Sequence, residues 1–179
     1  IGESPLNTLS GSLPVDGTIA KNVLSEVSRE VQSQGWHFNT HYKVSLSRDT
    51  DNKIPLSTNI VRVEIDPRQY SKVSYDIVQR NNFLYNLAKN EDTFDTNFKD
   101  ATAVYLLPFD EIPEQAKRYI TIRSARIFHD RTLGANTIHK FSQEDEAKSL
   151  SILKQAESHT GDYSIFDTPE QAYTIIRGN

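Results

Sequence analysis

Histidine is the side chain of this sequence best suited to bind a metal ion, and His37 and His41 lie only four residues apart in the stretch QSQGWHFNTH. On a single helix this spacing would place both imidazoles on one face, as in zinc proteases, but Phe38 occupies the position of their catalytic Glu. Gly35 predicts a helix end before both histidines. In an extended segment the two would be about 13 Å apart. The spacing therefore argues against a shared metal ion.

Pairs of carboxylates could perform acid/base chemistry if they were held about 5 to 9.5 Å apart around a substrate. Asp110 with Glu114 could supply such a pair, and so could the run of Glu144, Asp145 and Glu146. Capping and solvation of helices explain both groups more simply. We therefore predict that neither group is catalytic.

Other reactive motifs are missing from the sequence. There is no cysteine, which excludes thiol catalysis and cysteine-based zinc sites, and there is no Gly-x-Ser-x-Gly elbow or Walker lysine. His129 and His139 flank a short predicted turn and could approach each other, but no acid pair accompanies them. We predict no catalytic residue, no cofactor and no bound metal.

Aromatic residues in the middle of the chain could stack on bases or sugars. This set consists of Tyr70, Tyr75, Phe83, Tyr85, Phe94 and Phe98. A stacking platform needs Arg and Lys interleaved on the same face, and we see no such interleaving in the sequence. Core filling and partner contact are therefore the favoured roles.

The composition is that of a globular protein of 179 residues, with 36% hydrophobic and 25% charged residues. No apolar run approaches the roughly 20 residues of a membrane helix, so we expect no contact with a membrane. The formal charge of −4 provides no net attraction for nucleic acid, so a role near DNA would be passage or exclusion. Because the chain starts at Ile1 and contains no methionine, we expect a further segment upstream.

A first helix is predicted over residues 13–35. Its apolar stripe consists of Ile19, Val23, Leu24, Val27 and Val31, opposite a charged face of Lys21, Glu26, Arg29 and Glu30. Asp16 or Thr18 could cap its start, and Gly35 could cap its end. We expect Trp36 and Phe38 to anchor the helix exit in the core.

Residues 42–109 change to a strand pattern. The segments YKVSLS, NIVRVEID, KVSYDIVQ and ATAVYLLP are rich in β-branched and aromatic residues and are separated by the polar clusters RDTDNK and KNEDTFDTN. We predict four to six short antiparallel strands. Pro55, Pro67 and Pro108 should lie at strand ends or edges.

Two more helices are predicted after this β region. The first begins at Asp110 or at the Ile-Pro junction, has Pro113 in its first turn and ends at Gly134, with an inward stripe of Ala116, Tyr119, Ile120, Arg123 and Ile127. The second ends at Gly161 and buries Ile138, Phe141, Leu150, Leu153 and Ala156, with the run 144–146 on a solvated face.

The last segment, 162–179, has little helical periodicity but carries several large apolar residues. It either folds back on its own core or packs on a partner, and we favour the partner. The predicted contact residues are Ile165, Phe166, Tyr173, Ile175, Ile176 and Arg177.

The predicted fold class is therefore α+β. A bundle of about three helices is formed by residues 1–41 and 110–161, a small antiparallel β region is inserted at 42–109, and an extended docking arm follows at 162–179. A further helix is expected upstream.

Several segments, taken in order, resemble the tail tubular protein A family of short-tailed bacteriophages. SREVQSQGWHFNT is similar to the family's helix followed by Gly-Trp-x-Phe-Asn, and DEIPEQAKRYITIRSARIF is similar to its Asp-Glu-x-Pro-Glu helix. LGANTIHKFSQEDEAKSL resembles its Gly-Ala turn and acidic final helix, and IGESPLNTL its entry segment. The resemblance covers nearly the whole chain and is weakest over 42–109.

This resemblance implies a structural virion protein and not an enzyme. Members form a ring of twelve copies that docks beneath the portal at the capsid vertex and joins it to the nozzle, tail tubular protein B. Tail fibres attach near that junction, and the genomic DNA passes through the bore without specific binding. The resemblance thus implies a location in the virion tail, after assembly in the cytoplasm of the host bacterium.

Two other functions remain open from the residues alone. The first is a virion-associated glycan or peptidoglycan hydrolase, and the second is a generic α+β interaction module. A hydrolase would need a pair of acids that the sequence does not single out. A generic module would share the composition but has no reason to show the ordered set of matching segments.

Overall fold

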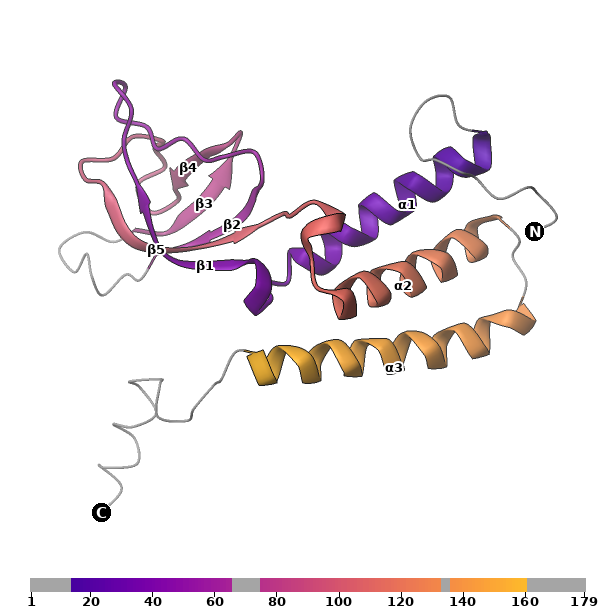
Figure 1. The fold of residues 1–179 in the computed structure, drawn as a ribbon. Helices are drawn as coiled ribbons and strands as arrows, with labels where there is room; N and C mark the ends of the chain where they lie inside the picture. Colours follow the sequence, from indigo (N-terminus) through magenta and orange to yellow (C-terminus); the bar gives the residue numbers. More distant parts are fainter. Residues whose placement is uncertain (1–13, 66–74, 133–135, 161–179) are drawn as a thin grey trace, which may run out of the picture. The chain divides into compact units, whose positions relative to one another are not determined.

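The computed structural model describes residues 14–65, 75–132 and 136–160, and the side chains of 136–142 lie outside the description. The chain divides into two compact units, residues 1–113 and 114–179. Within the described ranges, the first contains one α-helix and five short strands, and the second contains two α-helices (Figure 1). The predicted α+β class is confirmed. The assignment of 1–41 and 110–161 to one bundle stays a prediction.

Helix α1, Val15–Gln32, is amphipathic as the sequence predicts. Val23, Val27 and Val31 are each 1% exposed, and the charged residues of the opposite face are exposed. The predicted side-chain caps were wrong, because the capping position is Pro14, which makes no side-chain cap. Its extended backbone directs its carbonyl to the amide of Thr18, 3.0 Å away, and the Thr18 hydroxyl donates to the same oxygen at 3.2 Å.

The helix ends in a left-handed turn at Gly35, whose φ is +78°. The Gly35 amide donates to the carbonyl of Gln32 at 3.1 Å. A Cβ at this position would collide with the Arg62 guanidinium and lie 3.2 Å from Cγ2 of Val104. The predicted glycine cap is therefore confirmed, and a strand packed against the turn adds a second reason for glycine.

The exit from α1 is held by two fully buried amide side chains, Gln32 and Asn39, each 0% exposed. Gln32 pairs with the backbone of Leu107: its Nε2 donates to the carbonyl at 3.1 Å, and its Oε1 accepts from the amide at 2.8 Å. Asn39 Nδ2 donates to the carbonyls of Gln32 at 2.9 Å and Tyr105 at 2.8 Å. Its Oδ1 accepts the Trp36 amide at 2.8 Å. The two side chains thus join the helix end to the segment that leaves the sheet.

Trp36 and Phe38, the predicted anchors of this exit, are only half-buried. Trp36 contributes through its indole N–H, which donates to the carbonyl of Val31 at 2.7 Å. The prediction that these two residues fill the core was therefore wrong, because the backbone groups exposed at the helix end have to be hydrogen-bonded and polar Asn39 takes the buried position.

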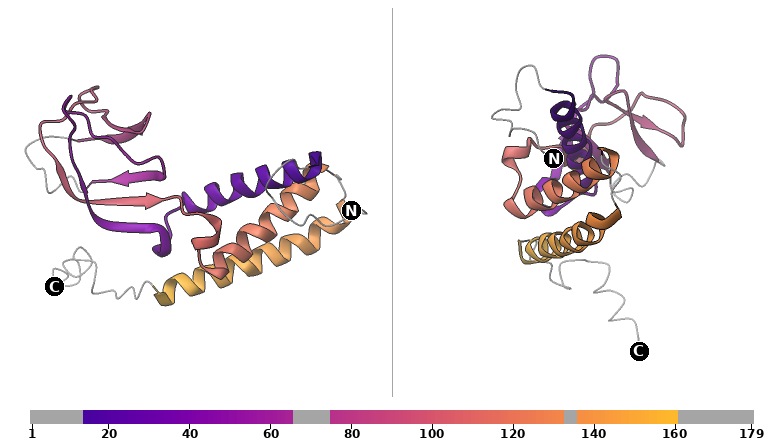
Figure 2. Two further views of the ribbon diagram at one scale, coloured as in Figure 1. Left: turned by 45° about the horizontal axis from the view of Figure 1, so that its top comes forward. Right: turned by 90° about the vertical axis from the view of Figure 1, so that its right-hand side faces the viewer.

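The five strands form two antiparallel sheets, as expected for the region 42–109. Strands β1 (Thr40–Leu46), β5 (Phe98–Tyr105) and β2 (Ile60–Glu64) form a sheet in the order β1-β5-β2. Strands β3 (Ile77–Arg80) and β4 (Phe83–Asn86) form a hairpin. Asn81 and Asn82 make its turn with φ of 48° and 62°, values that Asn tolerates in two-residue hairpin loops. Figure 2 shows the same arrangement from two further directions.

The core of the β region is a single apolar cluster. Its buried members are Leu46, Ile54, Leu56, Ile60, Leu84, Phe94, Phe98, Ala101 and Ala103. Pro55 forms an isolated bridge to Phe83, and Pro108 follows β5 and precedes the 3₁₀ turn Phe109–Glu111, so both lie at strand ends or edges as predicted. Pro67 lies outside the described residues.

The second unit is a pair of contacting helices, α2 (Glu114–Thr132) and α3 (Asn136–Thr160), which run side by side in both views (Figures 1 and 2). Helix α2 begins directly after Pro113, so the Ile-Pro junction opens it, Pro113 precedes the first turn, and Asp110 lies in the 3₁₀ turn before it. The predicted stops Gly134 and Gly161 lie outside the described residues.

The buried stripes of these helices differ in part from the prediction. Ala116, Tyr119, Ile120 and Leu153 are buried as predicted, Ile127, Leu150 and Ala156 are half-buried, and Ile138 and Phe141 lie outside the described side chains. Ser124 and Ser149 are buried instead, at 5% and 3% exposed. Small polar residues allow two helices to approach closely, which hydrophobicity patterns do not indicate.

Glu146 is the central charged group between α2 and α3, and the prediction of a solvated face was wrong for this residue. Its side chain is 12% exposed, accepts from Arg123 Nη1 at 2.8 Å and is also bonded to Arg126 Nε. Burial raises the pKa of Glu146, but the hydrogen bonds and positive charges of Arg126 and Arg123 outweigh it, so the pKa lies below its ordinary value of 4.5. Glu144 and Asp145 are exposed, as predicted.

Replacing Asn39 tests the junction between α1 and the sheet. Asn39→Ala removes three hydrogen bonds and leaves buried backbone groups without their partner, so we expect a loss of about 3 kcal/mol in the free energy of unfolding. Urea unfolding followed by circular dichroism measures the change. Gln34→Ala, in the exposed neighbouring turn, is the matched control and should change the stability little. Equal effects of the two substitutions would contradict the role assigned to Asn39.

Replacing Glu146 tests the ion pair between α2 and α3. We expect Glu146→Gln to lower the free energy of unfolding at pH 7 by about 1.5–3 kcal/mol, because two half-buried guanidinium groups lose the carboxylate that they share, although Arg126 keeps its ion pair with Asp130. Glu144→Gln, on an exposed position of the same helix, should have little effect.

The same ion pair predicts a pH dependence. Because the pKa of Glu146 is lower in the folded than in the unfolded chain, its contribution is complete above about pH 4.5 and is lost as the pH falls through the folded pKa. The stability difference between wild type and Glu146→Gln should therefore shrink in acid. A difference that stays constant from pH 7 to pH 3 would show that the carboxylate charge is not responsible.

Candidate functional site

The two histidines singled out by their spacing lie in different elements. His37 begins the 3₁₀ turn His37–Asn39, which differs from the extended segment expected there, and His41 lies in β1. Both are exposed, and the ring of His41 packs against that of Tyr105 with centroids 4.5 Å apart. In the described ranges, no group of three or more His, Cys, Asp or Glu residues is arranged to hold a metal ion.

The candidate carboxylates have structural partners or lie exposed at the surface. Glu114, in the first turn of α2, is bonded to Lys117 at 2.8 Å, and Glu146 is held by two arginines. Asp110 is exposed in the 3₁₀ turn. His129 is half-buried near the end of α2, while the side chain of His139 lies outside the description. The structure therefore gives Glu114 and Glu146 structural contacts that account for their positions.

Two of the five described residues of the aromatic set, Phe94 and Phe98, fill the core, as predicted, and Tyr75 packs against it. Phe98 is 0% and Phe94 5% exposed, and their rings meet edge to face with centroids 5.5 Å apart. Tyr75 packs edge to face on Phe98 at 5.1 Å, and its hydroxyl donates to Asp95 at 2.6 Å. That hydrogen bond holds the pKa of Asp95 below its ordinary value. Tyr70 lies outside the described residues.

The predicted docking residues of the C-terminal arm also lie outside the described residues. They are Ile165, Phe166, Tyr173, Ile175, Ile176 and Arg177. Their assignment stays a prediction. No described helix is long and apolar enough to cross a membrane.

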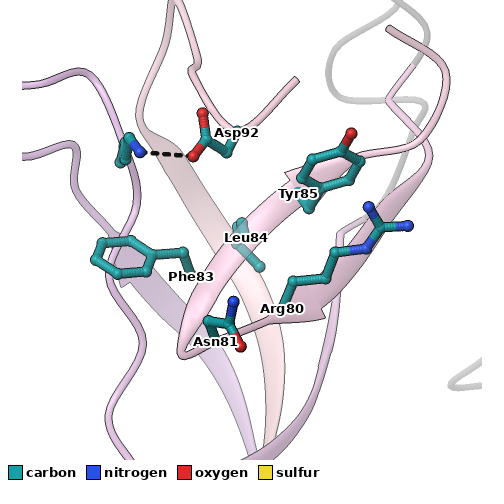
Figure 3. Close-up of a pocket in the computed structure, with 7 residues that line it drawn as sticks. Arg80, Asn81, Phe83, Leu84, Tyr85 and Asp92 are labelled. Carbon is teal, nitrogen blue, oxygen red and sulfur yellow. Dashed lines mark ion pairs between the residues drawn. The ribbon is translucent and has the colours of Figure 1, made fainter. Parts of the chain in front are cut away.

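A pocket of about 350 Å³ opens on the β3–β4 hairpin (Figure 3). Its lining consists of Lys53, Arg80, Asn81, Phe83, Leu84, Tyr85 and Asp92. Phe83 and Tyr85 alternate with buried Leu84 along β4, so their half-buried rings share one face of the hairpin. The apolar part of the pocket therefore comes from one short strand.

Arg80 lies beside these rings. Its guanidinium carbon is 3.9 Å from the centroid of the Tyr85 ring, a cation–π contact. Figure 3 draws the two side chains next to each other. In the antiparallel register Arg80 pairs with Phe83 and Val78 with Tyr85, so Arg80 and Tyr85 are diagonal neighbours. The expectation that no basic residue is interleaved with the aromatic residues was wrong here. The sequence signal that could have revealed this placement of Arg80 was the Asn-Asn pair between two short apolar runs, which is typical of a hairpin turn.

The second cation of the pocket is already neutralised. Lys53 Nζ lies 2.6 Å from a carboxylate oxygen of Asp92, the ion pair drawn as a dashed line in Figure 3. The hydrogen bond with Asp92 raises the pKa of Lys53, and the same bond lowers the pKa of Asp92. Both groups are therefore charged at neutral pH, and the pair contributes no net charge.

A second hollow, of about 300 Å³, lies between α1 and the segment that follows β5. Its apolar lining includes Leu24, Leu106, Leu107 and Phe109, and Lys21 lies at its edge. The Gln32–Leu107 hydrogen bonds fix the distance between its two walls. This geometry offers an apolar contact surface and presents no convergent reactive groups.

The comparison with protein families identifies the chain. A search of curated protein sequences finds no match. The family model described as tail tubular protein matches residues 1–163. This range includes both compact units up to the end of α3, and thus the glycine turn, the amide junction and the paired helices described above. The chain therefore belongs to the tail tubular protein family, whose members are structural components of the bacteriophage virion tail.

Proposed function

We propose that this chain is a subunit of the adaptor ring that joins the portal at the capsid vertex to the tail nozzle. Twelve copies form the ring, tail tubular protein B and the tail fibres attach on its far side, and the genome leaves through its bore. The observation that carries this proposal is the match to a structural tail family over residues 1–163. Assembly takes place in the host cytoplasm, before the ring becomes part of the virion.

The surface of the first unit supports ring formation. In a closed ring each copy uses two different patches, one for each neighbour. The hollow beside Leu24 and Phe109 is apolar and has fixed walls, which makes it a suitable surface for a neighbouring copy to cover. The ring wall is assigned to residues 1–41 and 110–161, and the nozzle and fibre contacts to the β region 42–109.

The charge of the chain supports passage of DNA. A protein that holds DNA neutralises phosphates with Lys and Arg, whereas this chain carries a formal charge of −4. A bore built from such subunits would not retain the genome by net attraction. The DNA therefore passes through the bore without specific binding.

A structural role also agrees with the contacts made by two of the acidic residues considered above as catalytic candidates. Glu114 and Glu146 are bonded to basic side chains in contacts that stabilise helices. The alternative of a glycan hydrolase predicts release of reducing sugars from capsular glycan or clearing of a peptidoglycan suspension. Glu111→Gln and Glu114→Gln would serve as controls in those assays.

The arm, residues 162–179, is assigned to the portal. Its large apolar residues would be buried there, so we expect deletion of 173–179 to abolish binding to the portal. Co-sedimentation of the purified protein with portal rings measures the binding. Thr174→Ala, which retains the apolar residues of the segment, should bind like the wild type.

Two further observations make this test decisive. The thermal unfolding midpoint of the truncated protein should match that of the wild type, because the deleted residues come after the end of α3 at Thr160 in the chain. Undiminished portal binding by the truncated protein would disprove the assignment of the arm.

The ring itself is tested by mass. We expect light scattering and negative-stain images to show a ring of twelve 20.4 kDa copies, either for the protein alone or after addition of the portal. Formation only with the portal would identify the portal as the template. A monomer that ignores the portal would contradict the adaptor role and make the hydrolase assays the next step.

A further inference from the structure

The pocket on the β3–β4 hairpin has a rigid frame. Strand β4 pairs with β3 on one side, and on the other side the Leu84 amide donates to the carbonyl of Ile54 at 3.0 Å. The Leu56 amide donates to the carbonyl of Asn82 at 2.7 Å, which holds the turn. Leu84 and Ile54 are both 0% exposed. Side chains on the outer face of β4 are therefore presented from a fixed backbone, as a binding site requires.

Among the residues that the structure describes, the pocket carries one positive charge without a carboxylate partner. Lys53 and Asp92 neutralise each other, which leaves Arg80. In the part of the chain that the structure describes, Arg80 has no carboxylate partner, and its guanidinium carbon lies 3.9 Å from the centroid of the Tyr85 ring. One fixed charge of +1 matches a single carboxylate better than a phosphate group, which carries up to two negative charges. The planar N–H fork of arginine fits a carboxylate with two parallel hydrogen bonds.

The remaining surface of the pocket favours an apolar group next to that carboxylate. The half-buried Phe83 ring supplies an apolar surface beside the cation. A sugar would need several free polar groups to bond its hydroxyls, yet the Tyr85 hydroxyl already donates to Asn90 at 2.5 Å and Lys53 is bonded to Asp92. A peptide with an acidic residue followed by an apolar residue matches both features of the pocket, the charge of Arg80 and the apolar ring of Phe83.

We propose that this pocket binds an acidic segment of a second protein chain, with one Asp or Glu carboxylate on Arg80 and the adjacent aromatic or large aliphatic side chain on Phe83. The site lies in the β region, to which the nozzle and fibre contacts are assigned. The proposal of peptide binding rests on that proposed function only for the identity of the chain that supplies the segment. Binding of the segment itself requires neither the ring nor the portal.

Fluorescence anisotropy with a labelled peptide, Gly-Ser-Glu-Phe-Ser-Gly, tests the proposal on the whole protein. We expect saturable binding, and about tenfold weaker binding of the same peptide with Gln in place of Glu, because one charge-assisted contact is lost. Arg80→Gln should weaken binding of the Glu peptide to the same extent and leave binding of the Gln peptide unchanged. Such a double-mutant cycle isolates the pairing of the two charges.

Three controls complete the experiment. Arg118→Gln removes an exposed arginine of α2 and should leave binding unchanged. Arg80→Lys keeps the charge but loses the fork, so binding should fall between that of wild type and Arg80→Gln. Replacing Phe in the peptide by Ala should weaken binding through the Phe83 contact.

Several results would overturn the proposal. They are the absence of binding at millimolar peptide, equal binding of the Glu and Gln peptides, or stronger competition by inorganic phosphate or oligogalacturonate than by unlabelled peptide. The comparison of the two peptides on the wild-type protein stays valid even if an Arg80 variant does not fold. Failure here would leave the adaptor role intact, because portal binding and ring mass are measured independently.

Discussion

The hydrogen bonds of Gln32 and Asn39 are the constraint on which the first unit depends. A helix end leaves carbonyl groups without partners, and here that end is buried against the segment leaving a sheet. Asn39 bonds the carbonyls of Gln32 and Tyr105, while Gln32 bonds the backbone of Leu107, so the buried groups satisfy one another. Because the partners are separated by as many as 75 residues in the chain, the junction fixes where α1 meets the β region.

The Gly-Trp-x-Phe-Asn segment gains a physical meaning from this junction. Gly35 supplies the left-handed turn, the Trp36 indole bonds a carbonyl of the last helical turn, and Asn39 closes the connection. The segment is thus a helix stop and a change of direction. His37, within this segment, and His41, two residues beyond it in β1, are both exposed.

Charge is used in two different ways in the molecule. Between α2 and α3, Glu146 and its two arginines form a half-buried ion pair that joins helices, which explains why an acidic run need not be a solvated face. In the pocket at the hairpin, Lys53 and Asp92 neutralise each other and Arg80 contacts the Tyr85 ring. The first arrangement stabilises the fold, and the second presents a fixed charge at the surface. A structural tail protein has use for both, since it must be stable and must recognise other chains.

The sequence by itself determined the fold class, the three helices, the antiparallel β region and the family, because helix periodicity, strand alternation and an ordered set of segments are local properties of the chain. Tertiary structure decided the rest. It buried Gln32 and Asn39, half-buried Glu146 between two arginines, and brought Arg80 over Tyr85 through strand register. These features depend on which distant groups need hydrogen-bond or charge partners. Hydrophobic patterns do not record such needs, since they are met only when separate elements pack together.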